Sequence, residues 1–373
     1  MSKIIQTVCE EKNCIGCGAC RDLCPKSAIR IIDRVSFMDA EINESLCIEC
    51  DLCKRVCPMN TTAYLRSPIL WKQGWCSDEE QRLTSSSGGA VSSIIRAFIK
   101  NQGVAIACSF NKGNFGFEIV THPADLKNIK GSKYVKSDAS GVYRAIKELI
   151  SQKKVLFIGL PCQVSALLNS LQYSKNIDNL YTIDLICHGT PSINLLNSFL
   201  KEYGANLNEL STISFRNNNS YNLSCNGKKI AGERIRDYYT SAFLKGTIHT
   251  EGCYKCRYAR RDRCSDITAG DSWGSELSQD EIDKGISLLL VQTQKGKALI
   301  EEADLSLYDV DIEKAIKANR QLIGPAEKDK KRQLFFNLYQ KSSSFNYAYR
   351  MCYPMHFFRQ EIKKTLYRLK LLR

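Results

Sequence analysis

The sequence has no apolar run that approaches the ~20 residues needed to span a bilayer. Its longest apolar runs, such as Val155 to Leu160, have the length of a strand. The segment Met1 to Asn13 lacks the apolar core of a secretory signal, and no nucleic-acid-binding motif or regulatory output domain is recognisable. These absences argue against a membrane-spanning, secreted or nucleic-acid-binding protein and against a redox-sensing regulator.

Cysteine, by contrast, is abundant, with 18 in 373 residues. Two runs fit the C-x2-C-x2-C-x3-C-P pattern of two-cluster ferredoxins, in which the fourth cysteine of each run ligates the other cluster. Equivalent positions differ by a constant 33, since 47 − 14 and 57 − 24 are equal, which indicates an internal duplication. On this rule one 4Fe-4S cluster is held by Cys14, Cys17, Cys20 and Cys57, and the second by Cys47, Cys50, Cys53 and Cys24.

A pair of structural zinc sites is the alternative, because four-cysteine zinc knuckles also use C-x2-C. Zinc ligation seldom needs a third cysteine two residues on and a fourth three later, twice over, so we favour iron-sulfur clusters. Iron-binding thiolates need a reducing compartment, which predicts a cytoplasmic protein.

The chain is too long for a ferredoxin alone and predicts two or three domains. The formal charge is +14, yet residues 1–66 hold nine basic and nine acidic residues. Residues 341–373 hold eight basic residues against Glu361 alone, and 8 − 1 = +7 is half of the total. There the apolar residues Phe358, Ile362, Leu366, Leu369 and Leu372 recur every three to four residues, which predicts a basic amphipathic helix. This helix would lie on an anionic membrane surface at the inner membrane face, bind a partner protein, or pack against the rest of the same chain.

Between these ends, strands alternate with helices, which predicts an α/β sheet with parallel pairs. A connector without a clear period, Met59 to Arg82, precedes it. The predicted strands are Val104 to Phe110, Phe117 to Thr121, Lys154 to Leu160 and Tyr181 to Ile186. The predicted helices are Ala90 to Lys100, Gly141 to Gln152, Gln163 to Leu171, Ser192 to Tyr203, Glu313 to Ile323 and Asp329 to Tyr339.

Functional loops in such a sheet leave the carboxyl ends of strands. Cys162 and Cys187 stand at two of these ends, and Cys253 and Cys256 supply two further thiols. Together they suffice for a third four-cysteine cluster, although buried structural cysteine explains Cys162 and Cys187 equally well from composition. Similarly, the Ser/Gly run at residues 85–89 opens a helix and would suit a cofactor's diphosphate or serve as a simple N-cap.

Six ordered motifs over roughly residues 70 to 300 resemble the coenzyme F420 hydrogenase/dehydrogenase beta subunit family, in which fusion to an N-terminal dicluster ferredoxin is familiar. They are Ser85-Ser-Ser-Gly-Gly89, Gly131-Ser-Lys-Tyr-Val-Lys-Ser137, Gly159-Leu-Pro-Cys-Gln163, Asp184-Leu-Ile-Cys-His-Gly189, Cys253-Tyr-Lys-Cys256 and Asp266-Ile-Thr-Ala-Gly-Asp-Ser-Trp-Gly274.

The resemblance implies a flavoprotein that holds FAD beside one 4Fe-4S cluster. It implies a flavin site near Ser86, Ser87, Gly88, Gly89, Lys133, Tyr134 and Ser137, and cluster ligands Cys162, Cys187, Cys253 and Cys256, with Cys264 as a rival to any of the four. We therefore expect an α+β ferredoxin-like dicluster domain at residues 1–66, an α/β core that binds FAD and an iron-sulfur cluster, and a helical tail. Within the core, residues 67–150 would correspond to the N-terminal region of the family and residues 151–305 to its C-terminal region. The basic tail covers residues 306–373.

The expected function is that of an FAD-dependent iron-sulfur oxidoreductase. Its electrons would pass between a small-molecule hydride donor or acceptor at FAD, either F420 or another organic molecule, and clusters that lead to a redox partner protein. One alternative is an electron-transfer subunit without substrate chemistry of its own. Another is a ferredoxin-dependent reductase of an unknown substrate, such as one from a polysaccharide pathway, because the family also includes members of that kind.

Overall fold

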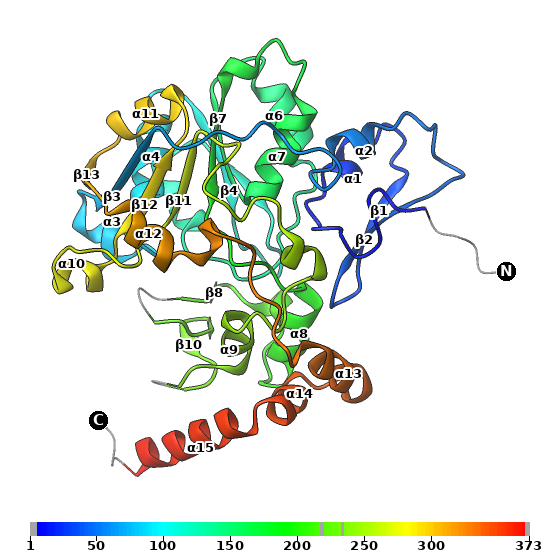
Figure 1. The fold of residues 1–373 in the computed structure, drawn as a ribbon, viewed down its shortest axis with the longest axis vertical. Helices are drawn as coiled ribbons and strands as arrows, with labels where there is room; N and C mark the ends of the chain where they lie inside the picture. Colours follow the sequence, from blue (N-terminus) through cyan, green and yellow to red (C-terminus); the bar gives the residue numbers. More distant parts are fainter. Residues whose placement is uncertain (1–5, 217–219, 233–234, 370–373) are drawn as a thin grey trace.

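A computed structural model describes residues 6–216, 220–232 and 235–369, and it shows a mixed α/β core with a small N-terminal part docked on one side (Figure 1). The N-terminal part is a two-stranded antiparallel sheet with two short helices. Its elements are α1 Ala19–Leu23, β1 Ile29–Asp33, β2 Met38–Ile42 and α2 Leu52–Val56. This arrangement agrees with the predicted ferredoxin-like part.

The core is one eight-stranded sheet in the order β13-β3-β12-β11-β7-β6-β4-β5. Pairs β4·β6, β6·β7 and β7·β11 are parallel, whereas β5, β12, β3 and β13 pair antiparallel, so the sheet is mixed. The strands are β3 Leu70–Cys76, β4 Val104–Cys108, β5 Phe117–Val120, β6 Val155–Gly159, β7 Leu180–Leu185, β11 Ile267–Asp271, β12 Ser287–Val291 and β13 Leu305–Tyr308.

Helices cover both faces of this sheet (Figure 1). Alternate residues of one strand point to opposite faces, so Val104 and Ile106 of β4 pack with α6, α7 and the N-terminal part, whereas Ala105 packs with α4 and α11 on the other face. These helices are α4 Ala90–Lys100, α6 Val142–Leu149, α7 Pro161–Ser170 and α11 Gln294–Glu301.

A second, aromatic core lies below the sheet in Figure 1 and joins four helices to residues such as Phe115 and Phe215. Its helices are α8 Ile193–Lys201, α9 Tyr238–Leu244, α13 Arg332–Ser342 and α14 Phe345–Cys352. The remaining elements are α3 Glu79–Leu83, α5 Leu126–Ile129, α10 Gln279–Lys284, α12 Ile312–Ala318, α15 Pro354–Arg368, and a small antiparallel sheet of β8 Ile213–Ser214, β9 Ser224–Cys225 and β10 Lys228–Lys229.

Several predicted elements need correction. The predicted connector Met59 to Arg82 contains β3 and all but the last residue of α3, and β3 lies inside the main sheet between β12 and β13. The helix predicted over Glu313 to Ile323 ends at Ala318, because Asn319 leaves the helical conformation (φ −107°, ψ 79°), and a short 3-10 turn, Arg320–Leu322, follows. No helix among the described residues is long and apolar enough to cross a membrane.

Candidate metal centres and the adjoining cavity

The two ferredoxin runs form two separate thiol sets, which we call the inner and the outer site. The inner site lies between α1 and the residue after α2, and its cysteines are buried at 6–8% exposure. They are the predicted Cys14, Cys17, Cys20 and Cys57, and all four line one small cavity. The fourth cysteine of the second run therefore lies beside the first three cysteines of the first run, as crossed ligation requires.

The outer site is formed by the other predicted set, Cys24, Cys47, Cys50 and Cys53, around a cavity of about 280 Å³. It is more open than the inner site, because Cys50 is exposed and the other three are half-buried. The two loops are built alike: the backbone N–H of Gly16 lies 3.4 Å from the Sγ of Cys14, and that of Glu49 lies 3.4 Å from the Sγ of Cys47. Gly16 and Glu49 both have positive φ angles, 63° and 55°, so the duplication keeps a left-handed turn even without glycine.

Sequence reasoning missed a fifth thiol in the inner site. Cys9 is buried and lines the same cavity as the four predicted ligands. Its hydrogen bond lowers the pKa of Cys57 to about 7 and also lowers the pKa of Cys14. No spacing signal identifies Cys9, because it lies outside the cysteine motif. The segment that carries Cys9 is held in place by the β-bridge of Thr7 with Glu41.

The third predicted set, the core site, comes from three separate loops. Cys162 lies in the first turn of α7, Cys187 follows β7, and Cys253 and Cys256 lie in and just after a 3-10 turn, Glu251–Lys255. All four line one cavity. The rival Cys264 is buried outside the set that lines this cavity, with its Sγ 4.0 Å from the carbonyl oxygen of Pro161.

Buried positive charge surrounds the core site. Lys136 and Arg263 line the same cavity, and Arg263 is fully buried in an ion pair with Asp184 at 3.3 Å. Burial alone would raise the pKa of Cys253, but the charge of Lys136 and a hydrogen bond from Thr250 lower it. Cys253 therefore favours the thiolate, which is the form that binds metal, whereas burial raises the pKa of Cys162, Cys187 and Cys256.

All three thiol sets have a donor arrangement that suits a 4Fe-4S cubane. A cubane presents four separate iron corners, so its four thiolates stand around a cavity instead of meeting at one point. The outer set lines a cavity of about 280 Å³, whereas the core and inner sets surround smaller cavities of about 30 and 10 Å³. Within residues 6–216, 220–232 and 235–369 no group of three His, Cys, Asp or Glu side chains could hold a single metal ion.

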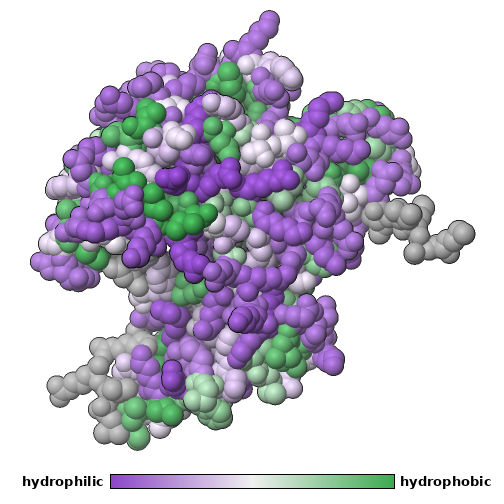
Figure 2. All heavy atoms as spheres, in the orientation of Figure 1, coloured by the Kyte–Doolittle hydropathy of each residue, from purple (hydrophilic) through white to green (hydrophobic). Residues whose placement is uncertain are grey.

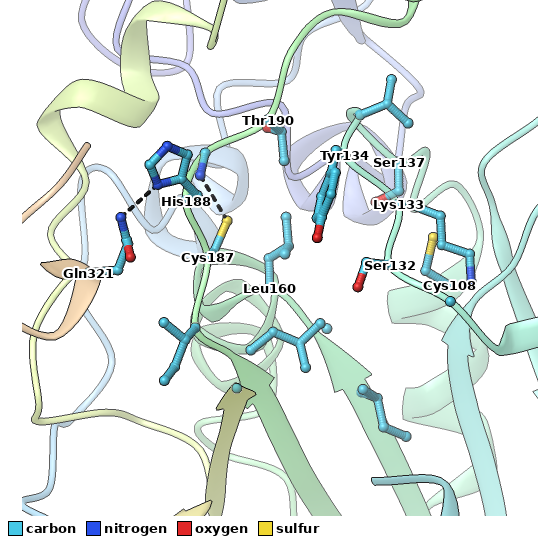
Figure 3. A pocket seen from close by; sticks show the side chains of 18 of the residues that line it. Cys108, Ser132, Lys133, Tyr134, Ser137, Leu160, Cys187, His188, Thr190 and Gln321 are labelled. Atoms are coloured by element: carbon cyan, nitrogen blue, oxygen red, sulfur yellow. Dashed lines mark hydrogen bonds between the residues drawn. The ribbon is translucent and has the colours of Figure 1, made fainter. Parts of the chain in front are cut away.

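A large cavity of about 430 Å³ opens at the carboxyl ends of β4, β6 and β7 (Figure 3). Leu160, Cys187, His188 and Thr190 line both this cavity and the core-site cavity, so the two share a wall. Of the predicted flavin residues, Lys133, Tyr134 and Ser137 line the large cavity. This volume and the mostly apolar wall are typical of a cofactor or substrate site.

An adjoining cavity of about 260 Å³ continues from the first and shares Gly131, Ser132, Tyr134 and Asp271 with it. Three other predicted flavin residues line it, namely Ser86, Ser87 and Gly89 at the N-terminus of α4. The Oγ of Ser86 accepts a hydrogen bond of 2.9 Å from the backbone N–H of Ser132, so the two predicted flavin loops are in contact. Gly88 lines neither cavity; a Cβ there would lie 2.5 Å from the carbonyl oxygen of Gly74, so this glycine serves packing on β3.

Lys133 enters the wall of the large cavity between two main-chain carbonyls. Its Nζ donates hydrogen bonds to Ile129 O at 2.8 Å and Lys130 O at 2.9 Å, and burial lowers its pKa to about 8. Its neighbour Cys108 also lines this cavity (Figure 3).

The opposite wall contains polar groups, of which the sequence had pointed to His188 and Asp271 but not to Gln321. Arg216, which lines the adjoining cavity, binds both carboxylate oxygens of Asp271, at 2.6 and 2.7 Å. His188 Nδ1 lies 2.6 Å from the amide nitrogen of Gln321 (Figure 3). Gln321 comes from the turn after α12, far from the other wall residues in sequence, so only the fold brings it here.

Comparisons with known proteins agree with both parts of the chain. Residues 13–61 match the 4Fe-4S dicluster domain, and residues 152–313 match the family described as the C terminus of the coenzyme F420 hydrogenase/dehydrogenase beta subunit. The coenzyme F420 hydrogenase subunit beta of Methanococcus voltae is 23% identical over 237 residues, which covers 61% of this chain and 78% of the relative. A chain in a structure of the F420-reducing [NiFe] hydrogenase complex from Methanosarcina barkeri matches with a TM-score of 0.49 and 15% identity, over 71% of this chain and 97% of that chain. The family resemblance read from the motifs is thereby confirmed.

Proposed function

We propose that this iron-sulfur electron-transfer protein is an FAD-dependent oxidoreductase. The proposal starts from the presence, in one chain, of a 4Fe-4S dicluster domain and a region that matches the coenzyme F420 hydrogenase/dehydrogenase beta subunit. FAD would occupy the large cavity and its extension at the N-terminus of α4. Three 4Fe-4S clusters would occupy the core, inner and outer sites. Electrons would pass between a small hydride donor or acceptor at FAD and a redox partner protein.

The observation that supports this proposal is that neighbouring sites share lining residues, one after another, from the large cavity to the inner site. The large cavity shares Leu160 and Cys187 with the core site. Ile15, in the loop between Cys14 and Cys17 of the inner site, lines the core-site cavity. The inner and outer sites belong to one small domain, and only the outer site has an exposed cysteine, Cys50. This order of sites supports an electron route from the large cavity to the exposed outer site.

FAD supplies hydride chemistry in electron pairs, whereas each cubane passes single electrons, so the flavin links the two kinds of transfer. The residues around the large cavity would bind and orient it. Tyr134 stacks on Phe243 with ring centroids 4.6 Å apart, which fixes an aromatic wall beside the core site. Leu160, between the large cavity and the core site, keeps water out of the shared wall. The Ser86 to Gly89 loop at the N-terminus of α4 would hold the diphosphate with backbone N–H groups.

The organic substrate is coenzyme F420 or another hydride carrier, and the curated relative is named for F420. Two alternatives use the same sites. In one, the chain only relays electrons to a catalytic partner; in the other, it is a ferredoxin-dependent reductase of another substrate, such as one from a polysaccharide pathway. Reduction of bound flavin by a soluble hydride donor favours the enzyme, whereas reduction only through a partner favours the relay.

The redox partner would dock over the outer site. Leu46 and Ile48, next to Cys47, are 48% and 55% exposed, and such an apolar rim beside an open cluster suits a transient protein contact. Electrons would leave or enter there, because the inner site is buried.

We also propose that α15 makes a peripheral contact with an anionic membrane. One side of the helix faces the body, where Lys364 lies over the Tyr238 ring at 5.9 Å. The other side exposes an apolar stripe with Arg359 and Lys363 beside it, and Figure 1 shows the helix running along the lower edge of the molecule. The stripe consists of Met355, Phe358, Ile362 and Leu369, each 57–66% exposed. Hydrophobic and hydrophilic side chains mix at the lower end of the surface in Figure 2, as in interfacial helices. The predicted Leu372 lies outside the described residues.

Cofactor analysis of anaerobically purified full-length protein tests the main proposal. Iron, acid-labile sulfide and heat-released flavin should amount to about twelve iron atoms and one FAD per chain, as three cubanes require. About eight iron atoms without flavin would overturn it and leave a two-cluster protein whose core binds neither flavin nor iron.

A further inference from the structure

Lys136 is a buried lysine at the junction of the core and the N-terminal part. It is 9% exposed, and its Nζ donates a 2.6 Å hydrogen bond to the carbonyl oxygen of Ile15. Its backbone N–H donates to Pro191 O at 2.9 Å, which fixes the segment from the other side. Whereas Lys133, three residues earlier, lines the large cavity, Lys136 lines the core-site cavity.

No carboxylate in the part of the chain that the structure describes forms an ion pair with Lys136, whereas Arg263 in the same cavity is paired with Asp184. A buried cation without a counter-ion is costly. Lys136 lines the core-site cavity together with Cys162, Cys187 and Cys253, and its hydrogen bond to Ile15 O reaches the loop between Cys14 and Cys17 of the inner site. The residues that line the outer-site cavity do not include Lys136.

We propose that Lys136 is the shared counter-charge of the core and inner iron-sulfur clusters and makes the reduction potentials of both less negative. The inference rests on the proposed function. A cubane with four thiolates is an anion, and the electron that reduces it adds one negative charge. A fixed cation nearby stabilises the reduced form more than the oxidised form, and this effect weakens with distance and solvent exposure. The core cluster should respond most, the inner cluster less, and the outer cluster not at all.

The test compares wild type, Lys136→Gln, Lys136→Arg and Lys12→Gln in the full-length protein purified without oxygen. Lys12→Gln is a matched control, because this substitution also removes one positive charge, but at an exposed position of the N-terminal part. Iron and sulfide are counted first, and the three clusters are then titrated by EPR-monitored redox titration. Lys136→Gln should make the core potential more negative, with a smaller shift at the inner cluster and none at the outer one. Lys136→Arg should largely restore the wild-type values, and Lys12→Gln should keep them.

Unchanged core and inner potentials in an iron-replete Lys136→Gln protein would overturn the proposal. If Lys136→Gln fails to assemble the core cluster but Lys136→Arg assembles it, the need for positive charge is supported. If both variants lose that cluster, Lys136 acts through shape and not through charge, and the proposal is wrong. Failure of the proposed function is distinguishable, because the wild type itself would then lack the third cluster.

Discussion

The carboxylate of Asp22 accepts a hydrogen bond of 2.9 Å from the backbone N–H of Tyr143, and this contact joins the ferredoxin helix α1 to the first turn of α6. A second bond of 2.9 Å from Gly141 N ends on the other carboxylate oxygen. In return, the hydroxyl of Tyr143 donates to Cys17 O at 2.8 Å. A buried carboxylate at a helix N-terminus satisfies free N–H groups and meets the positive end of the helix dipole.

Asp22→Asn should loosen this junction. The amide keeps one acceptor but loses the charge and places an NH₂ group against backbone donors, which costs about 1–3 kcal/mol. Hydrogen exchange should rise in α1 and the first turn of α6 without loss of iron. Glu44→Gln, which removes a carboxylate at an exposed position in the same domain, should leave exchange unchanged. Equal protection in the two variants would contradict the role of Asp22.

Crossed ligation makes a pairwise prediction. Cys57→Ala should damage the same cluster as Cys14→Ala, although residue 57 belongs to the second run; Cys24→Ala should match Cys47→Ala. The measurements are iron content and the EPR spectrum of the remaining clusters in each variant. If Cys57→Ala instead resembles Cys47→Ala, each run holds its own cluster and the crossed arrangement is wrong.

Ser86→Ala should weaken FAD binding. The change removes the acceptor for Ser132 N, which joins the two loops that border the adjoining cavity, and a lost hydrogen bond of about 1–1.5 kcal/mol corresponds to about a 5- to 13-fold higher Kd. Flavin fluorescence titration of deflavinated protein measures this. Ser77→Ala is the control, because Ser77 is exposed and its hydroxyl only approaches Ser306, 3.5 Å away. Equal affinities for the two variants would place the flavin elsewhere.

The membrane contact of α15 is tested with vesicles. Wild-type protein should sediment with vesicles that contain an anionic phospholipid, should not sediment with purely zwitterionic vesicles, and should be released by high salt. Phe358→Glu with Ile362→Glu should reduce binding at least several-fold, because both changes put negative charge into the exposed stripe. Tyr173→Glu, at a residue that is 91% exposed elsewhere, is the control. Unchanged binding of the double variant would contradict the proposal, and a stable dimer that the double variant abolishes would assign the stripe to a second copy.

The sequence was most informative where function fixes local spacing. The two ferredoxin runs predicted the partition into inner and outer sites, because consecutive cysteines within one loop must reach the same group. The core cysteines needed family resemblance, since Cys162, Cys187 and Cys253 come from separate loops that only the sheet brings together. Which of the twelve cysteines bind iron, which residues hold FAD, and the boundaries after residues 66, 150 and 305 stay predictions.

Other features were hidden from sequence for physical reasons. Strand β3 shows no alternation of apolar residues, because it carries the polar Lys72 and Gln73 side by side and its burial pattern does not alternate. Gly74 is required in it because a Cβ there would lie 2.0 Å from Ser306 O. Part of the wall of the large cavity was hidden because Cys108 and Gln321 lie on segments that are distant in sequence from the predicted flavin residues.

The position of β3 also determines the order in which this protein is completed during synthesis. Residues 6–66 contain all eight predicted cysteine ligands of the inner and outer sites and are translated before the rest of the described chain, so both ferredoxin clusters can be inserted early. Strand β3 follows at once, but its hydrogen-bonding neighbours, β12 and β13, lie near the other end of the chain. The central sheet is therefore completed late, because β3 pairs with strands that are far from it in sequence, and such long-range contacts slow folding. A nascent chain would carry a finished electron-transfer module before the core has a cavity to connect it with.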